Sequence, residues 1–199
     1  MIQSMKPLLL LGLLTGLSFF FSQPTVQAQC ELAIDEVDPF DSTRTIGALP
    51  VNFGYVIPSK FETAEGPKMV EEGKMLFSYT ENDSINGFFM TFAVQEYNYE
   101  QIETGHNVQV KLSDGEVIAL YNISDNGTFD KTTNMRIYQH TCIIPLDLFY
   151  RMTFSTIELM RIQYKKKNRI IEISKKQQEA FRAAIQCVGR HSGLYPVKP

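Results

Sequence analysis

Residues 107–121 read NVQVKLSDGEVIALY, and this stretch contains the strongest local signal for the fold. Its first half alternates between apolar and polar residues, which is typical of a β-strand with one buried face. Asp114-Gly115 follows, and such a pair favours the positive φ angles of a two-residue hairpin turn. Residues 116–121 then provide the returning strand. The sequence therefore predicts an antiparallel hairpin at this place.

Further strands are expected on both sides of the hairpin, because β-branched and aromatic residues are concentrated there. The expected strands are residues 45–57 (interrupted at Pro50), 74–80, 88–97, 135–144, 156–164 and 169–173. Segments rich in Pro, Gly, Asx and charged residues are expected to be irregular or to form turns. These segments are residues 30–42, 58–73, 81–87 and 125–134. Strands and helices do not alternate, which argues against a parallel sheet.

The best helix signal lies near the C-terminus. Ser174 and Gln177 have the spacing of a capping box. The residues that follow place an apolar face at helical spacing, and Gly189 is expected to end the helix. That face comprises Ala180, Phe181, Ala184, Ile185 and Val188.

A shorter helix is expected over residues 145–152, with Pro145 at its start. Together these elements predict an α+β fold. It is a mostly antiparallel β-sheet, either a curled sheet or a sandwich, with the C-terminal amphipathic helix packed on it. The tail, residues 190–199, has no pattern and is expected to fray.

The N-terminus has the layout of a secretory signal peptide. Lys6 precedes a run of 14 nearly all apolar residues, 8–21, which is shorter than the roughly 20 residues of a membrane-spanning helix. A polar stretch then ends at Ala28, where cleavage is expected. We therefore predict a signal peptide over residues 1–28 and a single globular domain over residues 29–199. Gln29 stands where a lipoprotein needs a small residue before Cys30, so the protein is not expected to be a lipoprotein.

The composition excludes several classes of protein. Nineteen Lys and Arg face 22 Asp and Glu, and the net charge of −3 argues against nucleic-acid binding. The hydrophobic fraction of 44% argues against a largely disordered chain. The sequence has no second apolar run of membrane-spanning length, so no transmembrane segment is expected in the mature chain.

Three cysteines follow the signal peptide: Cys30, Cys142 and Cys187. An exported chain meets an oxidising compartment, so one disulfide is expected. The sequence allows each of the three pairings and does not choose between them. No CxxC pair is present, which argues against zinc-ribbon and thioredoxin-type sites.

No motif assigns a catalytic, cofactor-binding or metal-binding residue. HExxH, GxSxG and phosphate-binding glycine loops are all absent. The three histidines, His106, His140 and His191, are dispersed along the chain. His140 and Cys142 share one face of an expected strand, and we interpret this pair as a packed face rather than as a thiolate–imidazole site.

Two acidic stretches, Asp35–Asp41 and Asp125–Asp130, have oxygens that calcium prefers, but neither has EF-hand spacing. A carboxylate pair for glycoside hydrolysis would draw on these acids and on Glu96, Glu100 or Glu103. The basic run Lys165–Lys167 with Arg169 is interpreted as a solvated hairpin tip, with contact to an anionic surface as the alternative. Four tyrosines, Tyr97, Tyr99, Tyr121 and Tyr138, are candidates for lining a groove.

The chain resembles small exported, functionally uncharacterised proteins of Bacteroidota over residues 108–188. The resemblance rests on VKLSDGEVIALYN at 110–122, IPLDLFYRM at 144–152, IELMRIQY at 157–164 and IEISKKQQEAFRAAIQCV at 171–188. It implies export from a Gram-negative cell, and the signal peptide leads us to expect a periplasmic or secreted protein. It implies no activity and no site residue.

The leading hypothesis is therefore a non-enzymatic binding or interaction module that meets an envelope or extracellular partner. A carboxylate-based hydrolase is the first alternative, and it requires two acids that converge in one pocket. A module that binds calcium or an anionic surface is the second alternative.

Overall fold

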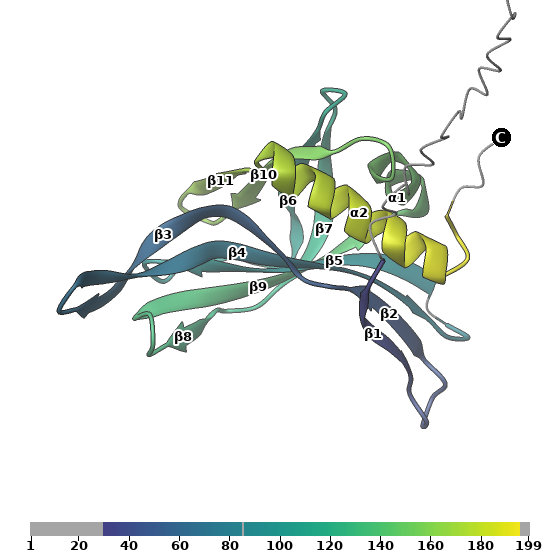
Figure 1. Cartoon of the computed structure of the whole chain (residues 1–199), viewed down its shortest axis with the longest axis horizontal. Helices are drawn as coiled ribbons and strands as arrows, with labels where there is room; N and C mark the ends of the chain where they lie inside the picture. The colour runs from purple at the N-terminus through teal and green to yellow at the C-terminus, as the bar shows by residue number, and fades with distance from the viewer. Residues whose placement is uncertain (1–29, 85, 196–199) are drawn as a thin grey trace, which may run out of the picture.

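The computed structural model describes residues 30–84 and 86–195 as one curled antiparallel sheet with two helices (Figure 1). The strands are β1 (Leu32–Val37), β2 (Arg44–Ala48), β3 (Val51–Thr63), β4 (Gly66–Glu81), β5 (Asn86–Glu96), β6 (Gly105–Leu112), β7 (Val117–Ser124), β8 (Thr128–Asp130), β9 (Met135–Ile144), β10 (Ile157–Gln163) and β11 (Asn168–Glu172). The helices are α1 (Leu146–Met152) and α2 (Lys175–His191). This arrangement confirms the predicted α+β class.

The strand order explains how the sheet curls. It runs β1-β2-β4-β5-β9-β7-β6-β10-β11, with β3 added to β4 and β8 added to β9. β4 is long enough to pair with β3 along its first half and with β2 along its end. The sheet does not return to its first strand, so it stays open.

The hairpin predicted from residues 107–121 is present as β6 and β7. The amide of Leu112 donates to the carbonyl of Glu116 at 2.8 Å, which closes the turn. Gly115 has a φ of 92°, at which the backbone of a residue with a side chain would be strained. The carboxylate of Asp114 accepts from the amide of Glu116 at 3.0 Å. The hairpin is therefore confirmed, but its predicted two-residue turn is wrong: three residues, 113–115, connect Leu112 to Glu116, and of Asp114 and Gly115 only Gly115 has a positive φ.

Both helices lie on the same side of the sheet, which we call the inner face. On α2, the ring of Phe181 packs edge-on against Phe53 of β3 and Phe77 of β4, with ring centroids 5.9 and 5.7 Å apart. On α1, the ring of Phe149 stacks on Phe88 of β5. These contacts build a core of buried side chains that alternates with polar or partly exposed positions along each strand.

The capping box of α2 is confirmed. The Ser174 hydroxyl accepts from the amide of Gln177, and the Gln177 side chain accepts from the amide of Ser174. The predicted end of the helix at Gly189 is wrong, because α2 continues to His191. Gly189 is needed inside the helix, where a Cβ would lie 2.9 Å from Cζ of Phe149. The left-handed glycine that ends the helix is Gly193, with a φ of 74°.

The tail is ordered further than expected. Residues 190 and 191 belong to α2, and Leu194 packs against the core. Residues 196–199 lie outside the described residues, as does the expected signal peptide over residues 1–28.

The expectation of an irregular segment over residues 30–42 is wrong. Leu32–Val37 forms β1, which pairs with β2 in a projecting hairpin (Figure 1). Ile34 of β1 lies against Gly47 of β2, where a Cβ would be 3.3 Å from Cδ1 of Ile34. The acidic residues of this stretch masked the strand signal, because they favour turns and depress β-propensity.

The expectation of a loop over residues 58–73 is also wrong. The segment forms the far ends of β3 and β4, joined by a turn at residues 64 and 65. β3 pairs with β4 alone, so the missing amide of Pro58 costs no hydrogen bond to a second neighbour. Residues 30–84 and 86–195 thus form eleven strands, more than the sequence predicts, and β8 lies within the expected loop 125–134.

A disulfide joins Cys30 to Cys187, with Cα atoms 5.2 Å apart, and ties the start of β1 to the last turns of α2. Cys142 is buried and unpaired. Within the part of the chain that the structure describes, neither helix is long and apolar enough to cross a membrane.

Candidate functional site

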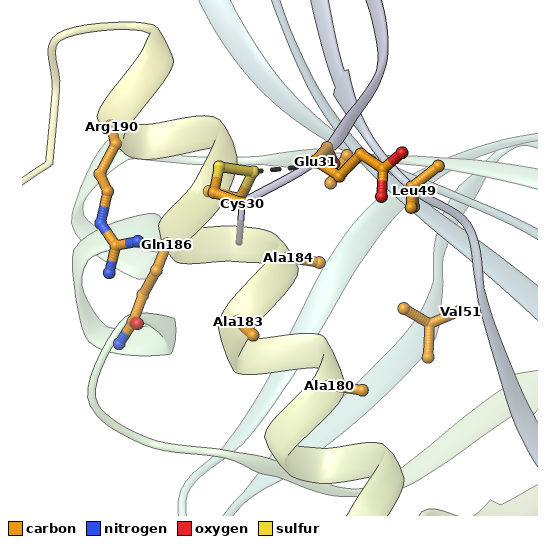
Figure 2. A pocket seen from close by; sticks show the side chains of 11 residues that line it. Cys30, Glu31, Leu49, Val51, Ala180, Ala183, Ala184, Gln186 and Arg190 are labelled. Carbon is orange, nitrogen blue, oxygen red and sulfur yellow. Dashed lines mark hydrogen bonds between the residues drawn. A yellow bond between two sulfur atoms is a disulfide. The ribbon is translucent and has the colours of Figure 1, made fainter. Parts of the chain in front are cut away.

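The candidate site is a groove between α2 and the corner where β2 leads into β3 (Figure 2). Its volume is about 440 Å³. One wall comes from residues around the Leu49-Pro50 corner, and the other comes from one side of α2 and the disulfide. The apolar lining comprises Ala48, Leu49, Val51, Ala180, Ala183, Ala184 and the Cys30–Cys187 disulfide.

The groove exists because α2 carries small side chains where it faces this corner. Ala180, Ala183 and Ala184 follow the spacing that puts residues on one side of a helix. Alanine has no atoms beyond Cβ, so the helix surface between the flanking larger residues stays hollow. Leu49 is 44% exposed on the opposite wall. Apolar surface therefore remains in contact with solvent along the groove.

The polar residues lining the groove comprise one acid, one amide and one base. Glu31 lies on the side of β1, and Gln186 and Arg190 extend from α2 (Figure 2). The Gln186 side chain donates to the carbonyl of Thr153 at 2.8 Å. The Arg190 guanidinium lies over the ring of Tyr195, 5.2 Å from its centroid. Two of the polar side chains are thus held by contacts of their own.

The disulfide end of the groove has a histidine but no reactive thiol. His191 Nδ1 lies 3.3 Å from Sγ of Cys30 and 3.0 Å from the carbonyl oxygen of Cys187. These two cysteines and His191 form the one group of three metal-ligating residues found among residues 30–84 and 86–195. Because metal ligation and nucleophilic attack need thiolates, the oxidised pair supplies neither.

The candidate carboxylates for a hydrolase come together only in part. Glu96 and Glu100 each place an oxygen 2.9 Å from Nζ of Lys167. The carbonyl of Glu103, by contrast, accepts from the side chain of Asn107. Glu96 is fully buried. A catalytic acid or base must reach its substrate, and this pair is instead neutralised by a lysine.

The basic run is not simply a solvated hairpin tip. Lys165 and Lys166 are exposed, as expected, but Lys167 bridges Glu96 and Glu100. Arg169 pairs with the buried carboxylate of Glu72. Burial alone lowers the pKa of the Lys167 ammonium, but hydrogen bonds and charge from Glu96 and Glu100 outweigh this and raise it. We call these ion pairs the charged seam, because they join the β10–β11 hairpin to β4 and β5.

His140 and Cys142 do share the inner face of β9, as predicted, but they do not form a reactive pair. Asn122 lies between them, with Nδ2 3.1 Å from Nδ1 of His140 and Oδ1 3.9 Å from Sγ of Cys142. Burial lowers the pKa of His140 to about 4, with a small opposing effect of Asp125. Burial raises the pKa of the Cys142 thiol to about 12. At neutral pH the two groups are therefore uncharged core residues.

The acidic stretches are used by their own turns. The Asp38 and Asp41 carboxylates accept from the amides of Phe40 and Thr43, and Asp35 pairs with Arg44. Hydrogen bonds from Thr43 lower the pKa of Asp41. Asp125 and Asp130 make the same kind of turn contacts. Within the described residues, neither stretch brings three carboxylates close enough to hold one ion.

The four candidate tyrosines do not line one groove. Tyr138 is buried, and its hydroxyl accepts from the amide of Glu100 at 2.6 Å. Tyr97 donates to the carbonyl of Pro58, and Tyr99 lies under the Arg136 guanidinium. Tyr121 is on the outer face, edge-on to His106.

No protein-family model, no curated protein and no solved structure matches this chain. The groove itself follows from contacts that are distant in sequence. The signal that marked it was the alanine spacing at residues 180–184, of which Ala180 and Ala184 were predicted to lie on the buried face of the helix and Ala183 was given no role.

The charged seam predicts that substituting two adjacent lysines changes the free energy of unfolding by different amounts. Lys167→Ala leaves Glu96 buried with only the more distant Arg169, so we expect the free energy of unfolding to fall by about 2 kcal/mol. Lys166→Ala removes an exposed charge and should change it by no more than about 0.5 kcal/mol. Urea denaturation of both variants measures the difference. Equal effects of the two substitutions would contradict the seam.

The buried neutral His140 predicts a pH dependence. Its pKa is about 4 in the folded state and about 6.5 in the unfolded state, so only the unfolded state takes up the proton between these values. The contribution is present above pH 6.5 and is lost as the pH falls towards 4. It amounts to about 3 kcal/mol. Urea titrations from pH 7 to pH 4 should show wild type losing this stability relative to His140→Gln, whereas parallel profiles would refute the assignment.

Proposed function

We propose that this protein is an exported, non-enzymatic binding module of the bacterial envelope that holds an apolar segment of a partner protein in the groove beside α2. The observation that carries the proposal is the solvent-open groove of about 440 Å³ with an apolar, small-residue lining. This volume lies within the range of known ligand sites, roughly 300–1,000 Å³.

The chemistry of the lining favours an apolar segment. Ala180, Ala183 and Leu49 offer contact surface without hydrogen-bonding groups of their own side chains. Burying one leucine-sized side chain there is worth about 1.5–3 kcal/mol. Glu31 and Arg190 supply one charge of each sign. A peptide with an apolar side chain and flanking polar groups matches this combination.

The groove is fixed before the partner arrives. The disulfide holds one end of α2, and Phe181 anchors its middle between Phe53 and Phe77. A preformed site avoids part of the ordering cost that binding otherwise incurs. The rigid walls therefore support a role in recognition.

Export is supported by the covalent link and by the N-terminal sequence. Disulfides persist in the periplasm and outside the cell, where thiols are not kept reduced. The expected signal peptide, with cleavage after Ala28, agrees with such a destination. The two alternative functions have weaker support, because Glu96 is closed off by Lys167 and the acidic stretches bond to their own turns.

A groove-filling substitution tests the proposal. Ala183 is exposed on the groove wall, so Ala183→Trp should fill the groove without disturbing the core. Ala64→Trp adds the same side chain at the exposed β3–β4 turn and is the matched control. Peptides selected from a displayed random library on the wild-type protein should bind Ala64→Trp unchanged. They should bind Ala183→Trp about 10- to 100-fold more weakly, by the loss of one buried apolar side chain.

The measurement is the dissociation constant of each selected peptide for the three proteins. The proposal fails if the library yields no binder, or if every binder tolerates Ala183→Trp as well as Ala64→Trp. Equal melting temperatures of the two variants ensure that loss of binding reports on the groove.

A further inference from the structure

The face of the sheet opposite the helices carries a continuous row of uncharged side chains. Successive strand pairings connect its members directly across six strands. In the order β1, β2, β4, β5, β9 and β7, the outer row consists of Ile34, Gly47, Ser78, Phe89, Ile143 and Tyr121. With strands about 4.8 Å apart, the row is about 24 Å long.

A second row beside it is also uncharged. It joins Leu76 to Thr91, Thr141 and Ile123, again by direct pairing. Ile123 is 50% exposed, and Tyr121 and Ile143 of the outer row are 41% and 39% exposed. Neither row contains an ionisable acid or base of the Asp, Glu, Lys, Arg or His type.

Both helices lie on the other side of the sheet. Phe88 and Phe77, which stack against α1 and α2, point away from the two rows because side chains alternate along a strand. Solvent-facing sheets ordinarily alternate apolar inner positions with polar or charged outer positions. An uncharged, partly apolar outer face is instead what two sheets present to each other when they stack about 10 Å apart.

We propose that this outer face is the interface between two copies of the chain, packed sheet against sheet about a two-fold axis. The absence of charge restricts the partner, because a charged surface pressed against these rows would lose its water without gaining an ion pair. A second copy of the same face is uncharged and has the same extent. In a two-fold dimer both copies use the same face to contact each other.

The charges that flank the rows agree with this pairing. Glu36 lies in the row next to the outer row. There it pairs with Thr45, and Thr45 pairs with Thr80. Lys74 lies in the row on the other side, paired with Ala93. A two-fold axis along the rows places the acid-bearing row of each copy over the lysine-bearing row of the other, with Glu36 and Lys74 two strands, or about 10 Å, apart along the rows. At this separation the flanking charges attract weakly across the interface and do not form a direct ion pair.

The dimer leaves both grooves accessible, since α2 is on the inner face of each copy. The protein would thus present two copies of the groove on opposite sides of a stacked pair of sheets. This inference stands apart from the proposed function, because it rests on different residues and on self-association alone.

Sedimentation equilibrium of the oxidised wild-type protein tests the inference. We expect a concentration-dependent dimer in the micromolar range. Ile143→Lys buries a charge within the outer row and should weaken the dimer at least about 100-fold. Ile170→Lys, at a 61% exposed isoleucine on β11, is the matched control and should dimerise as wild type does.

A second variant, Ile123→Lys, keeps the test decisive if Ile143→Lys lowers the melting temperature. Loss of the dimer in a folded variant of either row, with the Ile170→Lys dimer intact, supports the interface. A wild-type protein that stays monomeric at all accessible concentrations overturns it. A dimer that survives both row substitutions, or that Ile170→Lys also abolishes, overturns it as well.

Discussion

The packing of Phe181 between β3 and β4 is the interaction on which the other features depend. Its ring contacts Phe53 and Phe77, and Phe53 in turn packs edge-on against Phe92. Phe53 reaches this position only because Gly73 has no side chain, since a Cβ there would lie 2.4 Å from the Phe53 ring. Gly73 therefore makes room for the Phe53 ring that contacts Phe181. The position of α2 then fixes both the groove and the partner of Cys187.

The curled sheet is completed by polar contacts between side chains. No strand pairing joins β11 to β3 in the described chain, yet Tyr55 of β3 donates to Glu172 of β11 at 3.0 Å. Gln177 of α2 donates to the carbonyl of Gly54 at 2.9 Å. With the charged seam, these contacts hold β11 and α2 against β3, β4 and β5. Such contacts specify geometry more than they add stability, because each ion must give up its water.

Sequence reasoning succeeded where the signal was local. Asp114-Gly115 and the Ser174–Gln177 capping box determine a turn and a helix start within a few residues, and the strand over residues 135–144 has its predicted bounds. It failed where a distant neighbour overrides local preference. Gly189 continues a helix because Phe149 approaches it, and Pro58 sits in a strand because that strand has only one neighbour.

The candidate site was less accessible from the sequence than the fold. The Cys30–Cys187 pairing spans 157 positions, and three cysteines allow each pairing equally until the fold is known. The ion pairs of Lys167 and Arg169 also join residues that are distant in sequence, 71 and 97 positions apart. A basic run on a hairpin tip has no local feature that distinguishes solvated lysines from paired ones.

Recognition is proposed to occur on the groove side of α2, and photo-cross-linking from the groove in the living cell tests this claim most directly. A small diazirine-bearing amino acid at position 49, on the groove wall, would be photoactivated in intact host cells. The same residue at position 64 would serve as control. We expect a discrete cross-linked partner from position 49 that is absent from position 64. The same products from both positions, or none from position 49, would contradict it.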